Sequence, residues 1–206
     1  MYNLFRFNKN NMKKIKSIRC ERGMFKVFTS PLSCDGIDPQ TKAPVVFFKA
    51  GFFGPLTVYT DNTKSAAIIT CKSKRGKFGY ATWDVFDSEK GDKLLGTMSW
   101  AIIKTALAFG AEKWSVVKPD GSPFLTLETM NSSIAKRILD DMTNLYNPTH
   151  QYVVNNAAGK SVASIMAKRG FWGGAYSDFI LEDGASEEET KMALALFAGL
   201  VLLYKK

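Results

Sequence analysis

The chain has 206 residues, of which 46 % are apolar and 13 % aromatic, and this composition excludes a wholly disordered protein. Its length suits one domain of roughly 200 residues or two small ones. The 28 basic residues outnumber the 19 acidic ones, and the resulting net charge of +9 favours anionic partners such as lipid headgroups, phosphates or nucleic acid.

The first twenty residues are basic and contain no uninterrupted apolar segment of the secretory kind. We expect residues 1–20 to form a solvated basic tail and residues 21–206 to form the folded domain. A mitochondrial targeting segment and a membrane-surface tether are the alternatives for the tail. The cations that precede the first acid, Glu21, are Arg6, Lys9, Lys13, Lys14, Lys16 and Arg19.

Metal binding and catalysis find little support in the sequence. The three cysteines, Cys20, Cys34 and Cys71, match no zinc-ligand spacing, and the single histidine is His150. A Ser–His or Cys–His arrangement would have to use His150, which lies close to a proline in a predicted loop. We therefore expect a protein that is not an enzyme, holds no metal or other cofactor, and resides in a reducing compartment, the cytoplasm.

Four segments in the middle of the chain repeat a strand, a polar turn and a second strand. Each has β-branched or aromatic residues on both sides of a turn rich in Asp, Asn or Gly, which is the pattern of a β-hairpin. A sheet of so many antiparallel strands tends to close, because closure removes its exposed edges. The hairpins are expected at residues 56–72, 81–100, 113–129 and 152–168, and two earlier strands at 24–28 and 45–49.

Two short helices are expected outside the sheet. Residues 101–109 are apolar and are followed by Gly110, which can serve as a C-cap. Residues 134–146 carry apolar side chains at helical spacing, with serines before the start and Pro148 after the end.

The C-terminal segment predicts a helix that must be surrounded by apolar material. Ser186 and Glu189 form a capping box, and thirteen uncharged residues, 192–204, follow Lys191. A helix that is apolar on every side is enclosed by lipid or by protein, and a bilayer span needs about 20 residues. At about 1.5 Å per residue the segment covers roughly 20 Å, which suits the bore of a β-barrel. We expect a barrel to enclose it and to bury Leu194, Phe197, Val201 and Leu202.

The order of these elements resembles a known superfamily. The segment VVNNAAGKSVASIMAKRGFWGGAYSDFILEDGASEEETKMALALFAGLVLLY has the scramblase order of a hairpin, a strand ending in a basic-aromatic-glycine turn, an acidic-aromatic strand and a hydrophobic helix. The middle, ITCKSKRGKFGYATWDVFD followed by LLGTMSW, is similar to the basic hairpin of tubby. Residues 20–206 thus resemble the tubby C-terminal-like superfamily, which includes tubby, the phospholipid scramblases and the LURP-one-related proteins.

The resemblance implies a mainly β fold, a closed antiparallel tubby-like β-barrel of twelve strands around a central hydrophobic C-terminal α-helix. Scramblases also carry a calcium-associated acidic loop before this helix, and in residues 177–183 only Asp178 matches it. Asp183 with the glutamates at 187–189 is an alternative calcium site, although these glutamates are expected to complement the helix dipole. The cysteine-rich, lipid-modified stretch of animal scramblases has no counterpart in the sequence.

A basic cluster in one predicted hairpin is the first candidate site. Lys72, Lys74, Arg75 and Lys77 place four cations in six residues around Gly76. The likeness to tubby implies that such a hairpin binds phosphoinositide headgroups. A headgroup phosphate needs several converging N–H donors, which clustered Lys and Arg supply. The alternative is an ordinary solvated basic turn.

A second candidate cluster combines cations with aromatic residues. Lys160, Lys168 and Arg169 adjoin Phe171 and Trp172. This combination suits a membrane interface, where aromatic rings lie at headgroup depth. The alternative is that the two aromatic residues close one end of the barrel.

These features predict a cytoplasmic, peripherally membrane-associated monomer that binds anionic phospholipid or phosphoinositide through a basic face, with a scramblase-related role implied by the resemblance. The alternative is a soluble protein-interaction or signalling domain without a lipid role, whose protein partners the sequence does not identify. Nucleic acid is not an expected partner, because only the net charge favours it and none of the usual recognition motifs is present.

Overall fold

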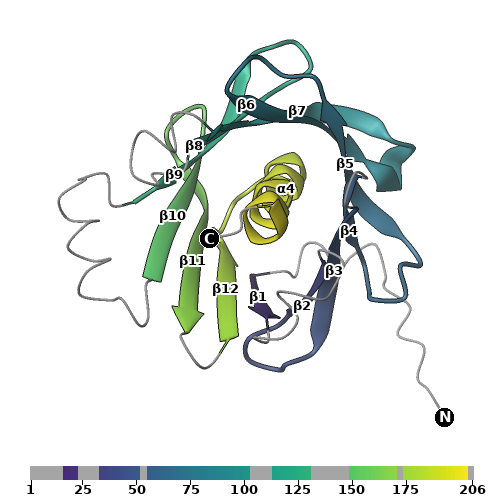
Figure 1. Cartoon of the computed structure of the whole chain (residues 1–206), viewed down its shortest axis with the longest axis vertical. Coiled ribbons are helices and arrows are strands. Elements are labelled where there is room, and N and C mark those ends of the chain that lie inside the picture. Colours follow the sequence, from purple (N-terminus) through teal and green to yellow (C-terminus); the bar gives the residue numbers. More distant parts are fainter. Residues whose placement is uncertain are drawn as a thin grey trace.

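Twelve β-strands form a closed barrel around one helix in the computed structural model of the chain (Figure 1). The structure describes residues 16–22, 33–51, 55–102, 113–130, 149–170 and 174–203. A short 3₁₀ helix, η2 (Ser88–Lys90), follows β6, and α4 (Glu187–Leu203) follows the last strand. The strands are β1 (Ser17–Arg22), β2 (Ser33–Ile37), β3 (Pro44–Ala50), β4 (Leu56–Tyr59), β5 (Ala67–Lys74), β6 (Tyr80–Asp87), β7 (Lys93–Ala101), β8 (Lys113–Val117), β9 (Pro123–Thr129), β10 (Thr149–Asn156), β11 (Ser161–Gly170) and β12 (Gly174–Leu181).

The barrel closes because its first and last strands pair. Every strand is antiparallel to its neighbours, and β1 pairs with β12 from Ser17 opposite Ile180 to Arg22 opposite Ala175. The expected closed antiparallel sheet is therefore confirmed. Because β1 begins at Ser17, residues 17–20, which the sequence placed in the tail, are part of the barrel wall.

A bidentate ion pair reinforces this seam on its outer face. Arg19 and Asp178 are direct cross-strand partners, and the guanidinium donates two hydrogen bonds of 2.6 Å to the two carboxylate oxygens. The guanidinium also lies 4.5 Å from the centre of the Tyr176 ring. The hydrogen bond to Asp178 raises the pKa of Arg19, and a parallel pair of charge-assisted bonds adds geometric specificity to the strand register.

The predicted hairpins are confirmed. They correspond to β4–β5, β6–β7, β8–β9 and β10–β11, each an antiparallel pair. The strand expected at 45–49 lies within β3, whereas the one expected at 24–28 falls outside the described residues. The helix expected at 134–146 also falls outside them. Of the helix expected at 101–109, only the first two residues are described, and the first of these ends β7.

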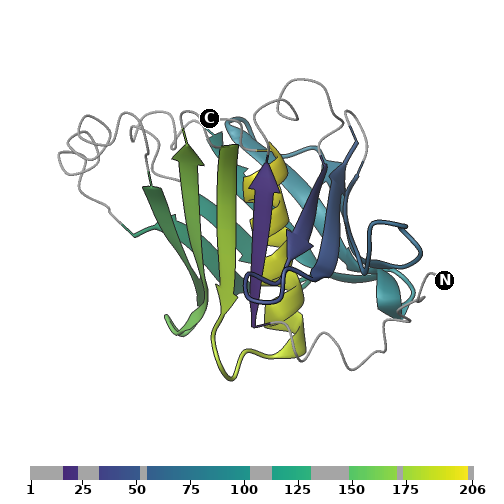
Figure 2. The same cartoon turned by 90° about the horizontal axis from the view of Figure 1, so that it is seen from below.

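Helix α4 runs along the inside of the barrel (Figures 1 and 2). It begins with the expected capping box, in which the Ser186 hydroxyl accepts from the Glu189 N–H at 3.2 Å and the Glu189 carboxylate accepts from the Ser186 N–H at 2.9 Å. The burial predicted for Leu194, Phe197, Val201 and Leu202 is confirmed, since each is at most 7 % exposed. The helix side chains in the core are Met192, Ala193, Leu194, Ala195, Leu196, Phe197, Ala198, Leu200, Val201 and Leu202.

Strand alternation supplies the wall of this core. In β3 the residues Val46, Phe48 and Ala50 are buried, while those between them are half-buried on the outer face. The Phe197 ring of α4 lies 5.6 Å from the Phe48 ring and 5.3 Å from that of Phe179 on β12. Helix and wall therefore share one continuous apolar core.

The barrel has two ends, which we call proximal and distal. The proximal end is where α4 begins, and it carries the β2–β3, β4–β5, β6–β7, β8–β9 and β10–β11 turns. The distal end is where α4 finishes, and it carries the β5–β6 turn (residues 75–79). The distal end is uppermost in Figure 2.

Candidate functional site

The β5–β6 hairpin brings the first predicted basic cluster to the distal end. Lys72 and Lys74 are two residues apart and share the outer face of β5, and Arg75 and Lys77 lie in the turn that follows. All four side chains are exposed. The turn is closed by a 3.0 Å hydrogen bond from the Tyr80 N–H to the Lys77 carbonyl. The structure thus places these four predicted residues on one short hairpin, which we call the basic hairpin.

Two of the four cations are engaged by the neighbouring strand β6. Lys74 Nζ lies 3.0 Å from Asp84 Oδ1, and Lys72 Nζ lies 4.8 Å from the centre of the Phe86 ring. The two cations in the turn have no acidic partner within the described part of the chain. Among the described residues, Asp84 is thus the one carboxylate that pairs with a cation of the basic hairpin, and the four hairpin cations leave a net positive charge there.

Exposed apolar side chains accompany these cations at the distal end. Phe78, beside Lys77 in the turn, is 95 % exposed, and Met130, just after β9, is 56 % exposed. Tyr80 at the start of β6 and Ile102 just after β7 are also exposed. Phe78 is not among the site residues predicted from the sequence. Its place in a Gly-rich polar turn was nevertheless a signal, because an aromatic residue at the tip of a turn cannot reach the core.

In the second predicted cluster, Lys160 is separated from Lys168. Lys160 lies in the β10–β11 turn at the proximal end, where its N–H donates to Asn156 Oδ1 at 3.0 Å. Lys168 is half-buried towards the distal end of β11, five strands away from β6 around the barrel. The Arg169 side chain and the whole of Phe171 and Trp172 lie outside the described residues, so their predicted roles are left as predictions.

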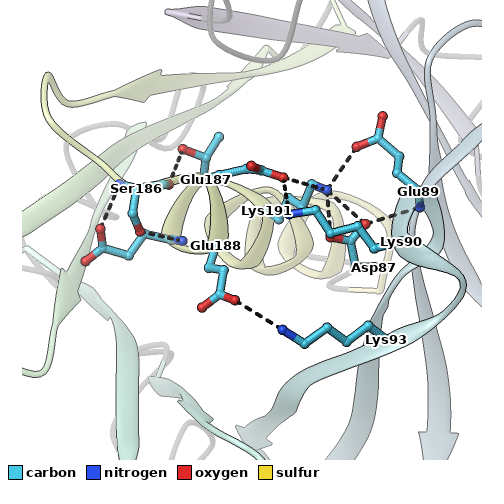
Figure 3. A network of polar contacts seen from close by, with 10 residues as sticks. Asp87, Glu89, Lys90, Lys93, Ser186, Glu187, Glu188 and Lys191 are labelled. Carbon is cyan, nitrogen blue, oxygen red and sulfur yellow. Dashed lines mark hydrogen bonds and ion pairs between the residues drawn. The ribbon is translucent and has the colours of Figure 1, made fainter. Parts of the chain in front are cut away.

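A buried ion cluster that the sequence analysis missed lies at the proximal end (Figure 3). Lys191, in the first turns of α4, is 1 % exposed, and its Nζ lies 2.8 Å from both carboxylate oxygens of Asp87. The same atom lies 2.9 Å from Glu89 Oε2 and 3.2 Å from Glu187 Oε1, and Lys90 Nζ lies 2.8 Å from Glu187. The cluster joins the start of the helix to the β6–β7 turn of the wall.

The pKa values of Lys191 and Glu187 are both shifted in the direction that stabilises their charged forms. Burial by itself lowers the pKa of Lys191, but its hydrogen bonds to Asp87 and Glu89 outweigh burial, so that the pKa is raised. Hydrogen bonds from Lys90 and Lys191 lower the pKa of Glu187. A lysine charge enclosed in a barrel is thus neutralised by carboxylates, which is the arrangement that a buried charge requires.

The acids considered as calcium ligands have other partners. Glu189 is occupied by the capping box and by a 3.0 Å hydrogen bond from Asn156 Nδ2, and the Ser186 N–H lowers its pKa. Within the described residues, no three His, Cys, Asp or Glu side chains are grouped so that they could hold a metal ion. The remaining pairs are Asp178 with Arg19, Asp183 with Lys16, Glu187 with Lys90, and Glu188 with Lys93.

The histidine and one cysteine occupy structural positions. His150 is the second residue of β10, opposite Ala167 of β11, rather than part of the expected loop, and its ring lies 6.5 Å from that of Tyr152. Cys71 is fully buried in the core, and burial raises its pKa to about 12. That thiol is therefore protonated at neutral pH, whereas the thiolate is the reactive form.

Comparison with known proteins does not identify a family. The chain matches no protein-family model, no curated protein and no solved structure. In the described part of the chain, no helix combines the length and the apolar character needed to cross a bilayer.

Proposed function

We propose that the chain is a tubby-like barrel protein that binds anionic phospholipid or phosphoinositide headgroups at a membrane surface through the basic hairpin. The observation that carries the proposal is the exposure of Lys72, Lys74, Arg75 and Lys77 on one hairpin. The tubby-like identity is supported by the closed twelve-stranded barrel around a C-terminal helix, which is the architecture that the sequence resemblance implies.

The chemistry of the hairpin fits a phosphate-bearing surface. Lys72 and Lys74 present ammonium groups from the outer face of a strand, and Arg75 adds a guanidinium from the turn. A guanidinium can donate two parallel hydrogen bonds to one phosphate, while ammonium groups act as point charges beside it. Each basic residue near an anionic bilayer contributes roughly 1 kcal/mol.

Binding is better supported than lipid movement. The bore of the barrel is occupied by α4, whose side chains pack against inward-facing strand residues such as Phe48 and Phe179. A lipid path through the bore would have to displace this core. We therefore propose that this protein shares the fold and the lipid contact of scramblases. We do not propose that it transfers lipid on its own.

The test compares two triple variants that remove the same charge. Lys72→Ala/Lys74→Ala/Arg75→Ala removes three cations from the basic hairpin, and Lys64→Ala/Lys93→Ala/Lys118→Ala removes three exposed lysines from the proximal end. Flotation on phosphatidylserine or phosphoinositide vesicles should show about a hundredfold loss of partitioning for the first variant, from roughly 3 kcal/mol. The control should bind nearly as the wild type does, and rising salt should narrow the difference because exposed charges are screened.

Other results would point elsewhere. Equal flotation of the two variants at low salt, with both folded, would reject the basic hairpin as the lipid site. If the wild-type chain does not bind any of the anionic vesicles, the alternative of a soluble interaction or signalling domain is favoured. Retention on DNA without vesicle binding would favour nucleic acid.

A further inference from the structure

Phe78 is the most exposed large apolar side chain in the described part of the chain, at 95 %. It lies in the β5–β6 turn between Lys77 and Gly79, and Gly79 has a φ of +83°. The hydrogen bond between the Tyr80 N–H and the Lys77 carbonyl closes the turn around it. The backbone of the turn therefore holds the ring outside the wall of the barrel, next to the cations of the basic hairpin.

Phe78 belongs to a group of exposed apolar residues on one sector of the distal end. Tyr80 pairs with Ala101 across β6 and β7, so that Ile102 lies beside it, and Met130 follows β9 at the same end. Single exposed apolar residues need no explanation, but Phe78, Tyr80 and Ile102 lie together at the distal ends of β6 and β7, and Met130 lies at the same end of the barrel two strands beyond β7. Of the large apolar side chains that the structure describes as exposed, only Ile180 lies elsewhere, on the outer face of β12 near the proximal end.

We propose that Phe78 inserts into the boundary between headgroups and acyl chains of an anionic bilayer and thereby docks the barrel with its distal end facing the membrane. This inference rests on the proposed function, because Lys72, Lys74 and Arg75 supply the attraction to anionic headgroups. An aromatic ring flanked by cations suits the interfacial layer of a bilayer, where rings lie at headgroup depth. Charge complementarity and the gathered apolar side chains thus point to the same surface.

Insertion predicts two separable components of binding. The contribution of the cations falls as salt rises, whereas burial of an apolar ring depends on area removed from water and persists at high salt. Phe78→Ala should therefore lower vesicle partitioning by about tenfold at every salt concentration. The triple variant of the basic hairpin should lose binding mainly at low salt.

The experiment uses the full chain and vesicles of phosphatidylcholine with phosphatidylserine. Phe78→Ala is compared with the matched control Ile180→Ala, which removes an exposed apolar side chain from the opposite end of the barrel. Both positions are exposed, so both variants should unfold thermally as the wild type does. A second pair, Phe78→Cys and Ile180→Cys, carries an environment-sensitive fluorophore, and labelling is selective because Cys20, Cys34 and Cys71 are buried.

The label at position 78 should shift to the blue and be quenched by lipids that carry a shallow quencher, while the label at position 180 should not change. A tenfold loss for Phe78→Ala with no loss for Ile180→Ala supports insertion. If the triple variant loses binding but Phe78→Ala binds as the wild type does, insertion is wrong and the proposed function stands. If the wild type binds no anionic vesicle, both proposals are wrong.

Discussion

Gly199 of α4 lies directly against the indole ring of Trp114 on β8. A Cβ atom at position 199 would be 3.0 Å from the Cη2 and Cζ3 atoms of that ring. The ring is fully buried and is stacked between two other indoles, with Trp83 at 5.8 Å and Trp100 at 5.5 Å. The glycine thus allows the helix to approach a stack of three tryptophans that lines one side of the bore.

Replacing Gly199 by alanine should destabilise the protein although alanine is the better helix former. Helix propensity favours alanine by about 1 kcal/mol, but forcing an extra methyl group into a packed core costs about 1–3 kcal/mol. We expect the second effect to win, because the flanking rings restrict how far Trp114 can move. Urea unfolding should show a lower midpoint for Gly199→Ala and a still lower one for Gly199→Val. If the Gly199→Ala variant is more stable than the wild type, the tryptophan stack can move to make room for the added methyl group.

Removing Lys191 should be among the most damaging single changes at the proximal end. Lys191→Met leaves the carboxylate of Asp87, which is 1 % exposed, buried without its cation. Breaking a buried pair in this way costs about 3–5 kcal/mol. The free energy of unfolding measured with urea should fall by that amount.

The matched control neutralises the other partner as well. Asp87→Asn keeps a side-chain oxygen that can accept from the Glu89 N–H, as the Asp87 carboxylate does at 3.1 Å. The double variant Lys191→Met/Asp87→Asn should recover a large part of the loss, because neither charge is then buried alone. A double variant as unstable as Lys191→Met would mean that packing of the lysine stem, and not the charge pair, determines stability there.

Acid should weaken the attachment of the helix start. The pKa values of Glu187 and Glu189 are lowered in the folded protein, Glu187 mainly by Lys90 and Glu189 mainly by the Ser186 N–H. Carboxyls with lowered folded pKa values stabilise the protein above their unfolded value of about 4.3, and this contribution is lost as the pH falls through the folded value. Among the described residues, the other carboxyls with lowered pKa values are Asp38, Asp61 and Asp120, all in turns.

The test is the pH dependence of unfolding for Glu187→Gln/Glu189→Gln beside the wild type. Glutamine at position 189 preserves the acceptor of the capping box. The variant should be less stable at neutral pH, and the two stability curves should converge as the pH falls below about 4. The three turn aspartates should leave the variant with some acid sensitivity. Parallel curves across the acid range would show that these two carboxyls do not carry the dependence.

The barrel could be predicted because its signals are local. Each hairpin is marked by β-branched and aromatic residues around a polar turn. The enclosed helix is marked by an apolar segment of thirteen residues, which is too short to span a bilayer. β1 was not predicted, although Ile18 and Cys20 alternate with polar residues. The many cations before them are typical of a solvated tail, and they make the alternation of apolar and polar residues in this strand hard to recognise.

The ion clusters could not be predicted in the same way. Lys191 and Asp87 are 104 residues apart, and Arg19 and Asp178 are 159 apart, so that no local pattern pairs them. Only the closed topology brings each pair together. The grouping of the basic hairpin could be predicted because its residues are adjacent in the chain, whereas Lys160 is separated from Lys168 because the two lie at opposite ends of one strand pair.

Alanine substitution should have very different effects on stability at a core phenylalanine and at a surface phenylalanine. Phe197 of α4 is fully buried between Phe48 and Phe179, so that Phe197→Ala removes a large apolar group and leaves a cavity in the middle of the bore. Such a change costs about 3–5 kcal/mol, and Phe197→Leu should cost less because more volume is kept. Phe78→Ala removes the same atoms from a ring that is 95 % exposed and should leave the free energy of unfolding within about 0.5 kcal/mol of the wild type. Urea unfolding followed by circular dichroism gives both values, and comparable losses at the two positions would contradict the enclosure of α4 by the barrel.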